Sequence, residues 1–394
     1  MYFDNASTSF PKPQAVIEGI NNYLAYEQGN SQRTTGKKNT DMIYETRKKL
    51  ANFFGVKSIN SMIFTSNATE SINVIIYGLL EQGDHVVTTA TEHNSVLRPL
   101  LDLKEKGIIT ISWVDCDSYG AINASSVIKK VKENTKLVIV NHGSNVTGAI
   151  QDIEKIGSQL KSTDAHFLID TSQTAGHIHI DNKNILADFI VFTGHKGLLG
   201  CTGIGGFYIN PEVQINPLKI GGTGVLSELL SQPQGLPLKY ESGTLNSLGI
   251  HSLYHSLDYL NSISIDTIGK KLEKNTDWIV KRISGYEDIE VYSRKNKLGI
   301  VSFNISKVQP VRVSHFLEEG IKLKSRAGLL CAPLIHEHLN TNPFGCVRVS
   351  ISHFTTDEEI EKFLRFIDEI IHNLSNIRNI KVPQVYETPT IYNV

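Results

Sequence analysis

The stretch ADFIVFTGHKGLLGCTGIGGFYI, residues 187–209, holds a lysine between two apolar runs that are typical of buried strands. Lys196 follows Thr193 and His195 in a turn of small residues. Burial at the end of a strand disfavours a charged amine, so such a lysine loses its proton more readily. A neutral amine can form a Schiff base with a carbonyl group. A lone lysine in a turn is more often an ordinary surface residue. The choice between a reactive and a surface lysine therefore depends on the residues around it.

The neighbour that favours the chemical interpretation is Asp170, at the end of the apolar run 166–170. Such a run predicts a buried strand with a carboxylate at its carboxyl end, the edge where open α/β sheets bind ligands. A lysine and a carboxylate on adjacent strand ends are what pyridoxal phosphate (PLP) requires. The lysine carries the cofactor, and the carboxylate keeps the pyridine nitrogen protonated. Asp170 taken alone could be a simple strand-end cap.

Composition limits the classes of partner. The chain has 394 residues, is 40% hydrophobic and carries a formal net charge of -1. This length allows two domains, and a net charge close to zero implies no polyelectrolyte partner. We expect no nucleic acid, because the basic residues are scattered, and no membrane, because no apolar run approaches spanning length. No signal peptide is recognisable, and the four cysteines lack paired spacing, so we expect free thiols in the cytoplasm.

Apolar strand-like runs alternate with helix-like segments between residues 62 and 209. The strand-like runs are 62–65, 86–89, 109–114, 137–141, 167–170, 189–193 and 205–209. The helix-like segments are 71–80, 96–106, 124–131 and 153–160. This alternation predicts an α/β fold with a mostly parallel sheet between helices.

The alternation of strand-like and helix-like segments ends after residue 209. Residues 211–244 are rich in Gly, Pro, Gln and Ser and predict a long functional loop, and a long helical segment follows from about 248 to 283. The mixed segments beyond it predict a smaller α+β domain. We therefore expect a large domain at 15–255, a small domain at 1–14 and 256–380, and a tail at 381–394.

Two segments are candidates for binding a phosphate. Thr193 and His195 flank the lysine, and Ala68 and Thr69 lie where a strand end runs into a helix. Backbone N–H groups at a helix N-terminus bind anions without basic side chains. The alternative is an ordinary capping box, in which Ser66 or Thr69 caps the helix.

Further polar residues follow other strand ends. His93 comes after the strand 86–89, and an imidazole there can stack on a flat cofactor and relay protons, although a lone loop histidine is usually just solvated. Asn145 follows the strand 137–141 and can bond the phenolic oxygen of the cofactor or a substrate group.

The late cluster SRAGLLCAPLI, residues 325–335, contains Arg326 and Cys331. A thiol near cationic groups can ionise and act as a nucleophile, whereas a buried apolar cysteine would be inert. Arg348 lies in the alternating strand 347–351, and arginine is the natural two-point partner of an α-carboxylate. An exposed strand face with a solvated arginine is the competing interpretation. The histidine pairs 177/179 and 336/338 lack a third credible ligand, so we expect no metal.

With these residues in place, the chain resembles the cysteine desulfurase branch, with its SufS-like and NifS-like members, of the class V, fold-type I PLP-dependent aminotransferases. The resemblance runs from residue 2 to about residue 355. It rests on the motifs NATE (67–70), EH (92–93), SNVTG (144–148), DTSQ (170–173), TGHK (193–196), ESGT (241–244) and RAGLLCA (326–332).

The resemblance implies a fold-type I PLP enzyme that converts L-cysteine, or a close analogue, to L-alanine and passes the sulfur to its own cysteine. Lys196, Cys331 and His93 would be catalytic. The cofactor would be held by Lys196, Asp170, Gln173, Ala68, Thr69, His93, Thr193 and His195, and by Thr244 from the other subunit of a homodimer. Asn145, Arg348 and Arg326 would bind the substrate. A sulfur-acceptor protein or a small thiol would collect the sulfur.

Two departures from the family pattern leave alternatives open. Leu329 and Leu330 stand where SufS-like members have two histidines, and Ala68-Thr69 stands where the family has two threonines. The alternatives are a selenocysteine lyase, a cysteine sulfinate desulfinase, or another class V reaction in which Cys331 is merely structural. A non-catalytic scaffold on the same fold is a further one.

Overall fold

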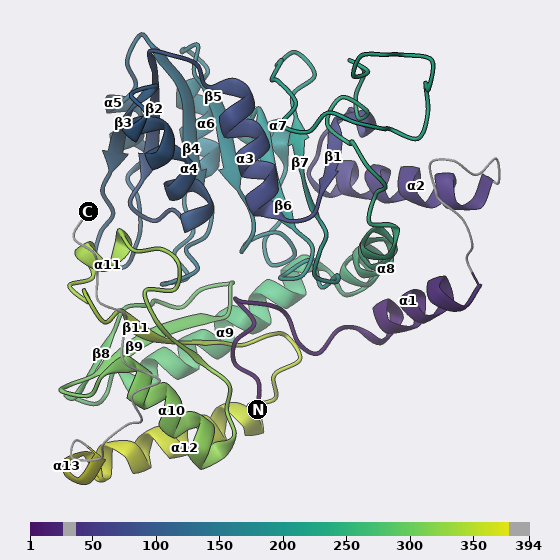
Figure 1. The fold of residues 1–394 in the computed structure, drawn as a ribbon. Helices are drawn as coiled ribbons and strands as arrows, with labels where there is room; N and C mark the ends of the chain where they lie inside the picture. The colour runs from purple at the N-terminus through teal and green to yellow at the C-terminus, as the bar shows by residue number, and fades with distance from the viewer. Residues whose placement is uncertain (27–36, 378–394) are drawn as a thin grey trace.

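The computed structural model describes residues 1–26 and 37–377, which form two β-sheets with helices packed around each (Figure 1). The larger sheet has seven strands in the order β1-β7-β6-β5-β4-β2-β3, and the smaller has four in the order β10-β11-β9-β8. The larger sheet consists of β1 (Met62–Thr65), β2 (Asp84–Thr89), β3 (Ile109–Val114), β4 (Thr135–Asn141), β5 (His166–Asp170), β6 (Phe189–Thr193) and β7 (Gly205–Ile209). The smaller consists of β8 (Ile289–Val291), β9 (Ile300–Ile305), β10 (Arg326–Gly328) and β11 (Cys346–Ser350).

Both faces of the larger sheet are buried. On β4, Leu137 and Ile139 belong to the apolar cluster that α3 (Ala68–Leu79) and α4 (Asn94–Glu105) cover, while Val138 and Val140 belong to the cluster on the opposite face. Strands buried on both faces are apolar throughout, which is why these runs lack alternation in the sequence. The strands from β3 to β6 pair in parallel, and only β7 runs antiparallel to its neighbours. The predicted α/β fold is therefore confirmed.

The helices complete the two layers and the smaller domain. The large sheet also carries η1 (Ile59–Ser61), α5 (Ala124–Lys129), α6 (Ile153–Leu160) and α7 (Asn182–Ile185). Around the small sheet lie α10 (Pro310–Ile321), α11 (Ile335–His338), α12 (Asp357–His372) and α13 (Leu374–Ile377). Two helices precede the alternating pattern and were not predicted: α1 (Gln14–Tyr26) and α2 (Lys37–Phe53).

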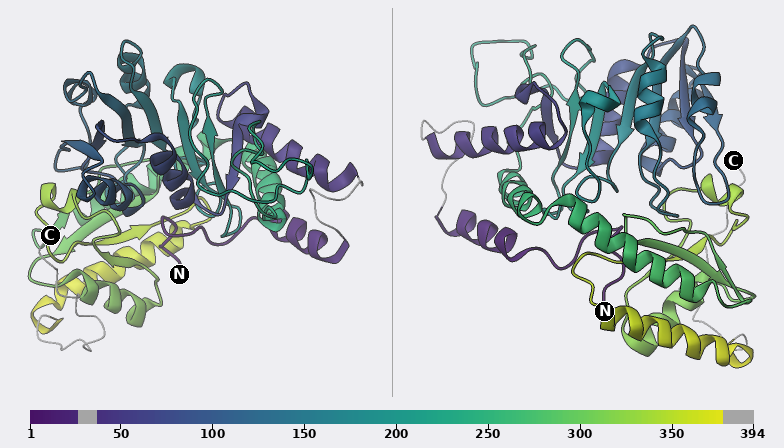
Figure 2. Two further views of the ribbon diagram at one scale, coloured as in Figure 1. Left: turned by 45° about the horizontal axis from the view of Figure 1, so that its top comes forward. Right: turned by 180° about the vertical axis from the view of Figure 1, so that it is seen from behind.

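One helical segment differs from its prediction. Residues 248–283 were expected to be one helical segment, but they contain two helices, α8 (Ser247–Ile263) and α9 (Ile265–Ile283). They meet at Ser264, whose φ of 72° is outside the helical region and ends the first helix. Because α8 packs on α1 and α2 while α9 packs on β9 and α12, this break carries the chain from the large sheet to the small one (Figure 2).

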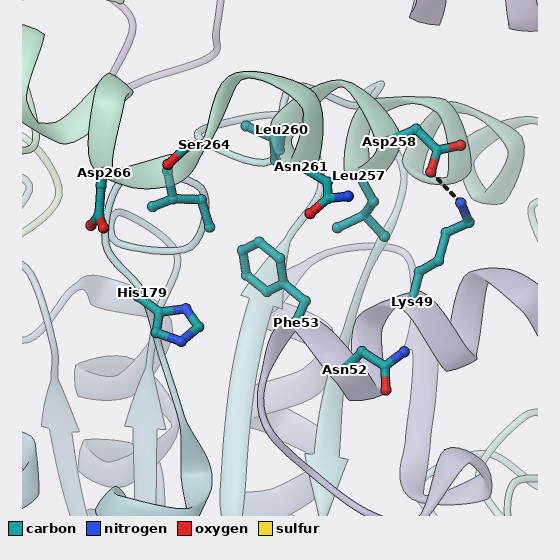
Figure 3. A pocket seen from close by; sticks show the side chains of 11 residues that line it. Lys49, Asn52, Phe53, His179, Leu257, Asp258, Leu260, Asn261, Ser264 and Asp266 are labelled. Carbon is teal, nitrogen blue, oxygen red and sulfur yellow. Dashed lines mark hydrogen bonds and ion pairs between the residues drawn. The ribbon is translucent and has the colours of Figure 1, made fainter.

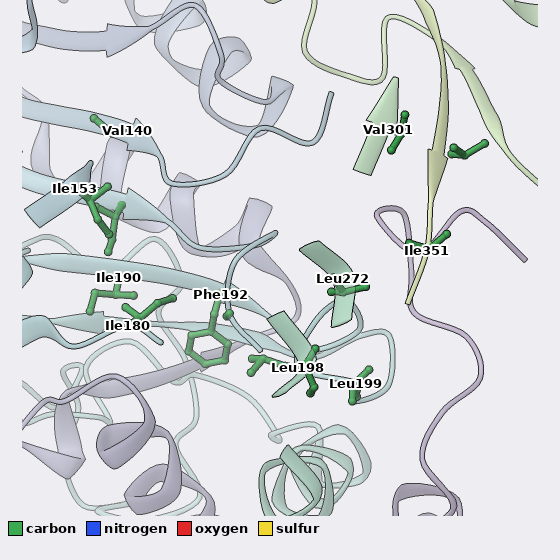
Figure 4. Packing of buried hydrophobic residues seen from close by; sticks show 14 of the residues in the cluster. Val140, Ile153, Ile180, Ile190, Phe192, Leu198, Leu199, Leu272, Val301 and Ile351 are labelled. Atoms are coloured by element: carbon green, nitrogen blue, oxygen red, sulfur yellow. The ribbon is translucent and has the colours of Figure 1, made fainter. Parts of the chain in front are cut away.

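A continuous apolar core joins the two sheets. Val140 and Ile190 lie at the large-sheet end of this cluster, and Leu272, Val301 and Ile351 lie at the small-sheet end (Figure 4). The two layers therefore share one core, so they stabilise each other by burying common apolar surface.

The N-terminal segment crosses between the layers. Tyr2 and Asp4 form parallel bridges with Lys324 and Ser350 at the small sheet, and the Ser9 N–H donates to the carbonyl of His195, 2.9 Å away. The contacts of Tyr2 and Asp4 lie beside the small sheet, whereas the contact of Ser9 lies at the turn that follows β6 of the large sheet. The domain boundaries themselves stay a prediction, and the predicted tail at 381–394 lies outside the described residues.

A buried ion pair ties the long loop 211–244 to the large sheet. Arg47 on α2 donates to the carboxylate of Glu241, and Glu241 also accepts from the Phe64 N–H of β1, 2.7 Å away. The two side chains are only 6% and 1% exposed. Breaking such a pair leaves one charge buried without its partner.

We expect Glu241→Gln to lower the free energy of unfolding by about 3 kcal/mol, because it leaves the Arg47 charge uncompensated. Urea denaturation of the variant measures this change. The double variant Arg47→Met/Glu241→Gln should lose less than the sum of the two single losses, because it buries no unpaired charge. Strictly additive losses would contradict the proposed coupling.

Candidate active site

A cavity of about 230 Å³ lies at the carboxyl ends of the parallel strands. Nine of the predicted site residues line it: Ala68, Thr69, His93, Asn145, Asp170, Gln173, Thr193, His195 and Lys196. Four residues that were not predicted also line it: Asn67, Ser95, Asn141 and Ser172. Asn141 and Asp170 are paired in register as the last residues of β4 and β5, so the strand-end rule could have found Asn141 as well.

Lys196 is half-buried and lines the cavity. Desolvation by burial lowers the pKa of its amine to about 8, and the negative charge of Asp170 opposes that shift. Asp170 is 4% exposed, and its Oδ1 accepts from the Ser172 N–H at 2.9 Å. The amine is therefore far easier to deprotonate than an ordinary lysine, while a carboxylate remains close by.

His93 is held as a neutral imidazole. It is the N-cap of α4, and its Nδ1 accepts from the Ser95 N–H at 3.0 Å, which leaves the proton on Nε2. Burial, followed by the positive charge of Lys196, lowers the His93 pKa to about 4. A neutral ring can lie against a flat ligand without adding a second buried positive charge to the site.

One end of the cavity is suited to an anion. The helix α3 begins there, and the first N–H groups of a helix have no intrahelical partner. Among the described residues, Thr193 Oγ1 and His195 Nδ1 are buried side-chain atoms without a hydrogen-bond partner. Buried polar groups normally have partners, so these two atoms fit a bound polar group. This donor set suits a phosphate.

The capping of α3 differs from the alternative considered from the sequence. Asn67, not Ser66 or Thr69, is the N-cap, and its side chain accepts from the Glu70 N–H at 2.9 Å. Ser66 instead donates its N–H to the Glu70 carboxylate. The cap therefore does not use the Thr69 hydroxyl.

Gln173 and Asn145 are both fixed by backbone carbonyls. Gln173 Nε2 donates to the Ala6 carbonyl at 3.0 Å, and Asn145 Nδ2 donates to the Leu330 carbonyl at 2.7 Å. Asn145 Oδ1 is buried without a partner among the described residues. These bonds leave one polar atom of Asn145 available to a ligand.

The two arginines lie opposite each other in the small sheet. Arg326 of β10 is paired in register with Arg348 of β11. Arg326 is exposed, whereas Arg348 is buried and does not line the cavity. Arg348 Nη1 nevertheless donates to the carbonyl of Asn145, a lining residue, at 2.9 Å, so the guanidinium lies near the cavity. The competing interpretation of Arg348 as a solvated residue on an exposed face is wrong.

Cys331 is exposed at the tip of a short loop, so the alternative of a buried apolar cysteine is wrong. Leu330 and Cys331 have φ values of 52° and 58°, in the left-handed region. The Cys331 carbonyl accepts from the Asn94 N–H at 2.7 Å, next to His93. The loop therefore holds the thiol close to the cavity while leaving it accessible.

Thr244 does not line the cavity. It lies exposed at the end of the long loop. Its predicted contact with the cofactor of another subunit stays a prediction. Among the described residues, no group of three or more His, Cys, Asp or Glu side chains could hold a metal ion, and no helix there is long and apolar enough to cross a membrane.

A second, larger cavity of about 550 Å³ lies between α2, α8 and the start of α9 (Figure 3). Its lysine, Lys49, is paired with Asp258, as the dashed line in Figure 3 marks. Neither that lysine nor any other lining residue is a predicted site residue. The smaller cavity therefore remains the candidate site, because chemistry rather than volume distinguishes the two.

Most of the chain matches proteins of one known family. The model of the Aminotransferase class-V family matches residues 1–363. Probable cysteine desulfurases of Methanothermobacter thermautotrophicus and Pyrococcus abyssi are both 36% identical to this chain, and the matches cover 94% and 95% of each protein. The apo structure of the cysteine desulfurase from Thermococcus onnurineus NA1 superposes with a TM-score of 0.88 at 32% identity, over 95% of both chains. The chain therefore belongs to the class-V aminotransferase family and, within it, to the cysteine desulfurase branch. The resemblance inferred from its motifs is confirmed.

The lowered pKa of Lys196 predicts a specific labelling behaviour. In cofactor-free protein, reductive alkylation with an aldehyde should modify Lys196 half-maximally near pH 8, because the neutral amine is the reactive form. Ordinary lysines require roughly pH 10. Mass spectrometry of the labelled peptide gives the midpoint. Asp170→Asn should move that midpoint lower, because the carboxylate raises the pKa of Lys196; an upward move would contradict the assignment.

Proposed function

We propose that this protein is a PLP-dependent cysteine desulfurase, which converts L-cysteine to L-alanine and transfers the sulfur to Cys331. The observation that carries this proposal is the lining of one cavity by both Lys196 and Asp170, with their charges interacting. The curated relatives named cysteine desulfurase add support.

The residues of the cavity fit PLP. Lys196 would carry the cofactor, Asp170 would face its pyridine nitrogen, Gln173 its phenolic oxygen, and His93 its ring. The phosphate would take the N-terminus of α3, at Ala68 and Thr69, together with Thr193 and His195. When bound, PLP draws electrons away from the α-carbon of an amino acid.

The side chains of the chain supply the remaining chemistry. Arg348 and Arg326 would attract the substrate carboxylate, and Asn145 would orient the substrate through its unpartnered Oδ1. The amine of Lys196, with a pKa of about 8, is able to take the α-proton near neutral pH and return it. Lys196 is thus the general base of the proposed reaction.

Cys331 would accept the sulfur. Its thiolate attacks the sulfur of L-cysteine, the carbon–sulfur bond breaks, and a sulfur–sulfur bond forms on Cys331. The carbon takes up a proton, so the products are L-alanine and a persulfide on the enzyme. The exposed position of Cys331 then lets a small thiol or an acceptor protein collect the outer sulfur.

We also propose that the protein acts as a homodimer in the cytoplasm. Thr244 would reach the cofactor phosphate of the other subunit. The long loop that precedes Thr244 exposes several large apolar side chains, among them Leu218, Ile220, Leu229 and Leu230. Clustered exposed apolar residues support a surface that another chain covers.

Cys331→Ser should abolish the formation of sulfide and alanine from L-cysteine, because the hydroxyl cannot accept the sulfur. The visible absorbance of the bound cofactor should stay unchanged, since Cys331 does not line the cavity. Assaying sulfide and alanine together on the purified protein makes the measurement, with Cys201→Ser as the matched control. Full activity in Cys331→Ser would refute the assignment of the nucleophile. Alanine yields from selenocysteine and cysteine sulfinate would then distinguish the alternatives.

Asp170→Asn tests the cofactor assignment. An opposite charge nearby shifts a pKa by about 1–3 units, so loss of the carboxylate should lower turnover roughly 10- to 1000-fold while PLP stays bound. Turnover and cofactor content of the purified variant provide the two measurements. Turnover equal to that of the unsubstituted protein would show that Asp170 does not face the pyridine nitrogen.

A further inference from the structure

The buried guanidinium of Arg348 already holds a carboxylate from its own chain. Nη2 donates to Asp4 Oδ1 and to Ser7 Oγ, each 2.8 Å away, and Nη1 donates to the Asn145 carbonyl at 2.9 Å. Ser7 Oγ in turn donates to Asp4 Oδ1 at 2.8 Å. The Arg348 side chain is 3% exposed and that of Asp4 is 15% exposed. Asp4 is thus the more accessible member of the pair.

Arginine can bind a carboxylate through two hydrogen bonds in two geometries, and both geometries use Nη2. One fork pairs Nη2 with Nη1, and the other pairs Nη2 with Nε. Nη2 of Arg348 already donates to Asp4. A second carboxylate that bound in either of these two ways would therefore lie next to the negative charge of Asp4. A substrate carboxylate therefore competes with Asp4 for this nitrogen.

The Nε of Arg348 shows where an incoming carboxylate fits. It is buried and has no hydrogen-bond partner among the described residues. A buried donor without a partner is costly. A carboxylate that replaces Asp4 on Nη2 would also reach Nε, so the exchange satisfies a donor that Asp4 leaves without a partner.

Release of Asp4 from Arg348 would be a movement of its side chain alone. Its backbone is held to the small sheet, where the Asn5 N–H donates to the Ser350 carbonyl at 3.1 Å. Arg326 lies opposite Arg348 in register, and the charges of Asp4, Arg348 and Arg326 all act on Tyr2. Arg326 therefore offers a released Asp4 a second cation close by.

We propose that Asp4 is a placeholder carboxylate, which occupies Arg348 until the α-carboxylate of the substrate displaces it. Asp4 is then a positioning residue that sets substrate affinity. It keeps the buried arginine in an ion pair when no substrate is bound. It weakens the binding of any amino acid by the free energy needed to displace Asp4 from Arg348. This inference rests on the proposed function only in taking Arg348 as the site of the substrate carboxylate.

The test compares two ligands that differ only in the carboxylate. Isothermal calorimetry on the holoenzyme gives the Kd for L-alanine and for ethylamine, which is alanine without its carboxylate. Asp4→Asn keeps the shape and the hydrogen-bond acceptor but removes the competing charge. Exposed ion pairs contribute at most about a fivefold effect, and the Asp4–Arg348 pair is more buried than those, so we expect the Kd for L-alanine to fall at least on the order of fivefold. The Kd for ethylamine should stay unchanged. The KM for L-cysteine should fall with the Kd for L-alanine.

Two further variants serve as a control and as a substitute for Asp4→Asn. Asp277→Asn, in an exposed pair with Lys281 at 2.7 Å, is the matched control and should change neither Kd. Ser7→Ala removes the hydroxyl that holds Asp4 in place, so it should lower the Kd for L-alanine by a smaller factor, and it serves if Asp4→Asn does not fold.

An unchanged or higher Kd for L-alanine in Asp4→Asn, or in Ser7→Ala where that variant alone folds, would overturn the proposal. An equal fall in the Kd for ethylamine would overturn it as well. Failure of the proposed function looks different, because the protein would then release neither sulfide nor alanine from L-cysteine while the titration with L-alanine still reports on Arg348.

Discussion

The burial of the Lys196 amine beside the carboxylate of Asp170 is the constraint on which the site depends. A buried amine is tolerated because it can become neutral, and a nearby carboxylate limits how far its pKa falls. Parallel pairing of β5 and β6 brings both residues to one edge of the sheet. The turn after β6 must also be tight. A Cβ on Gly197 would lie 2.4 Å from the Ala175 carbonyl, so only glycine fits there.

The same cavity keeps polar atoms that the fold itself does not satisfy. Thr193 Oγ1, His195 Nδ1 and Asn145 Oδ1 are buried without partners in the described part of the chain. Each such atom costs stability, and a core built for stability alone would replace it with an apolar group. Their gathering around one lysine indicates that binding, rather than folding, determines these residues.

The sequence predicted the strand ends well and the long-range contacts poorly. The runs before Asp170 and Thr193 are apolar because both faces of the sheet are covered, so their ends could be located from hydrophobicity alone. The break at Ser264 could not be predicted, because serine has no intrinsic preference for a left-handed backbone and tertiary packing imposes it. The partner of Arg348 was equally hidden, since no local pattern links it to Asp4.

The crossing of the N-terminal segment between the two sheets has a consequence for biosynthesis. Asp4 and Arg348 are 344 positions apart in sequence, and the Ser9 N–H bonds the carbonyl next to Lys196. On the ribosome, Ser9 can meet His195 once about half of the polypeptide has emerged, but Asp4 cannot meet Arg348 until almost all of it has. A nascent chain can therefore build the parallel sheet early, yet it becomes able to recognise an amino acid only after translation of the small sheet is complete.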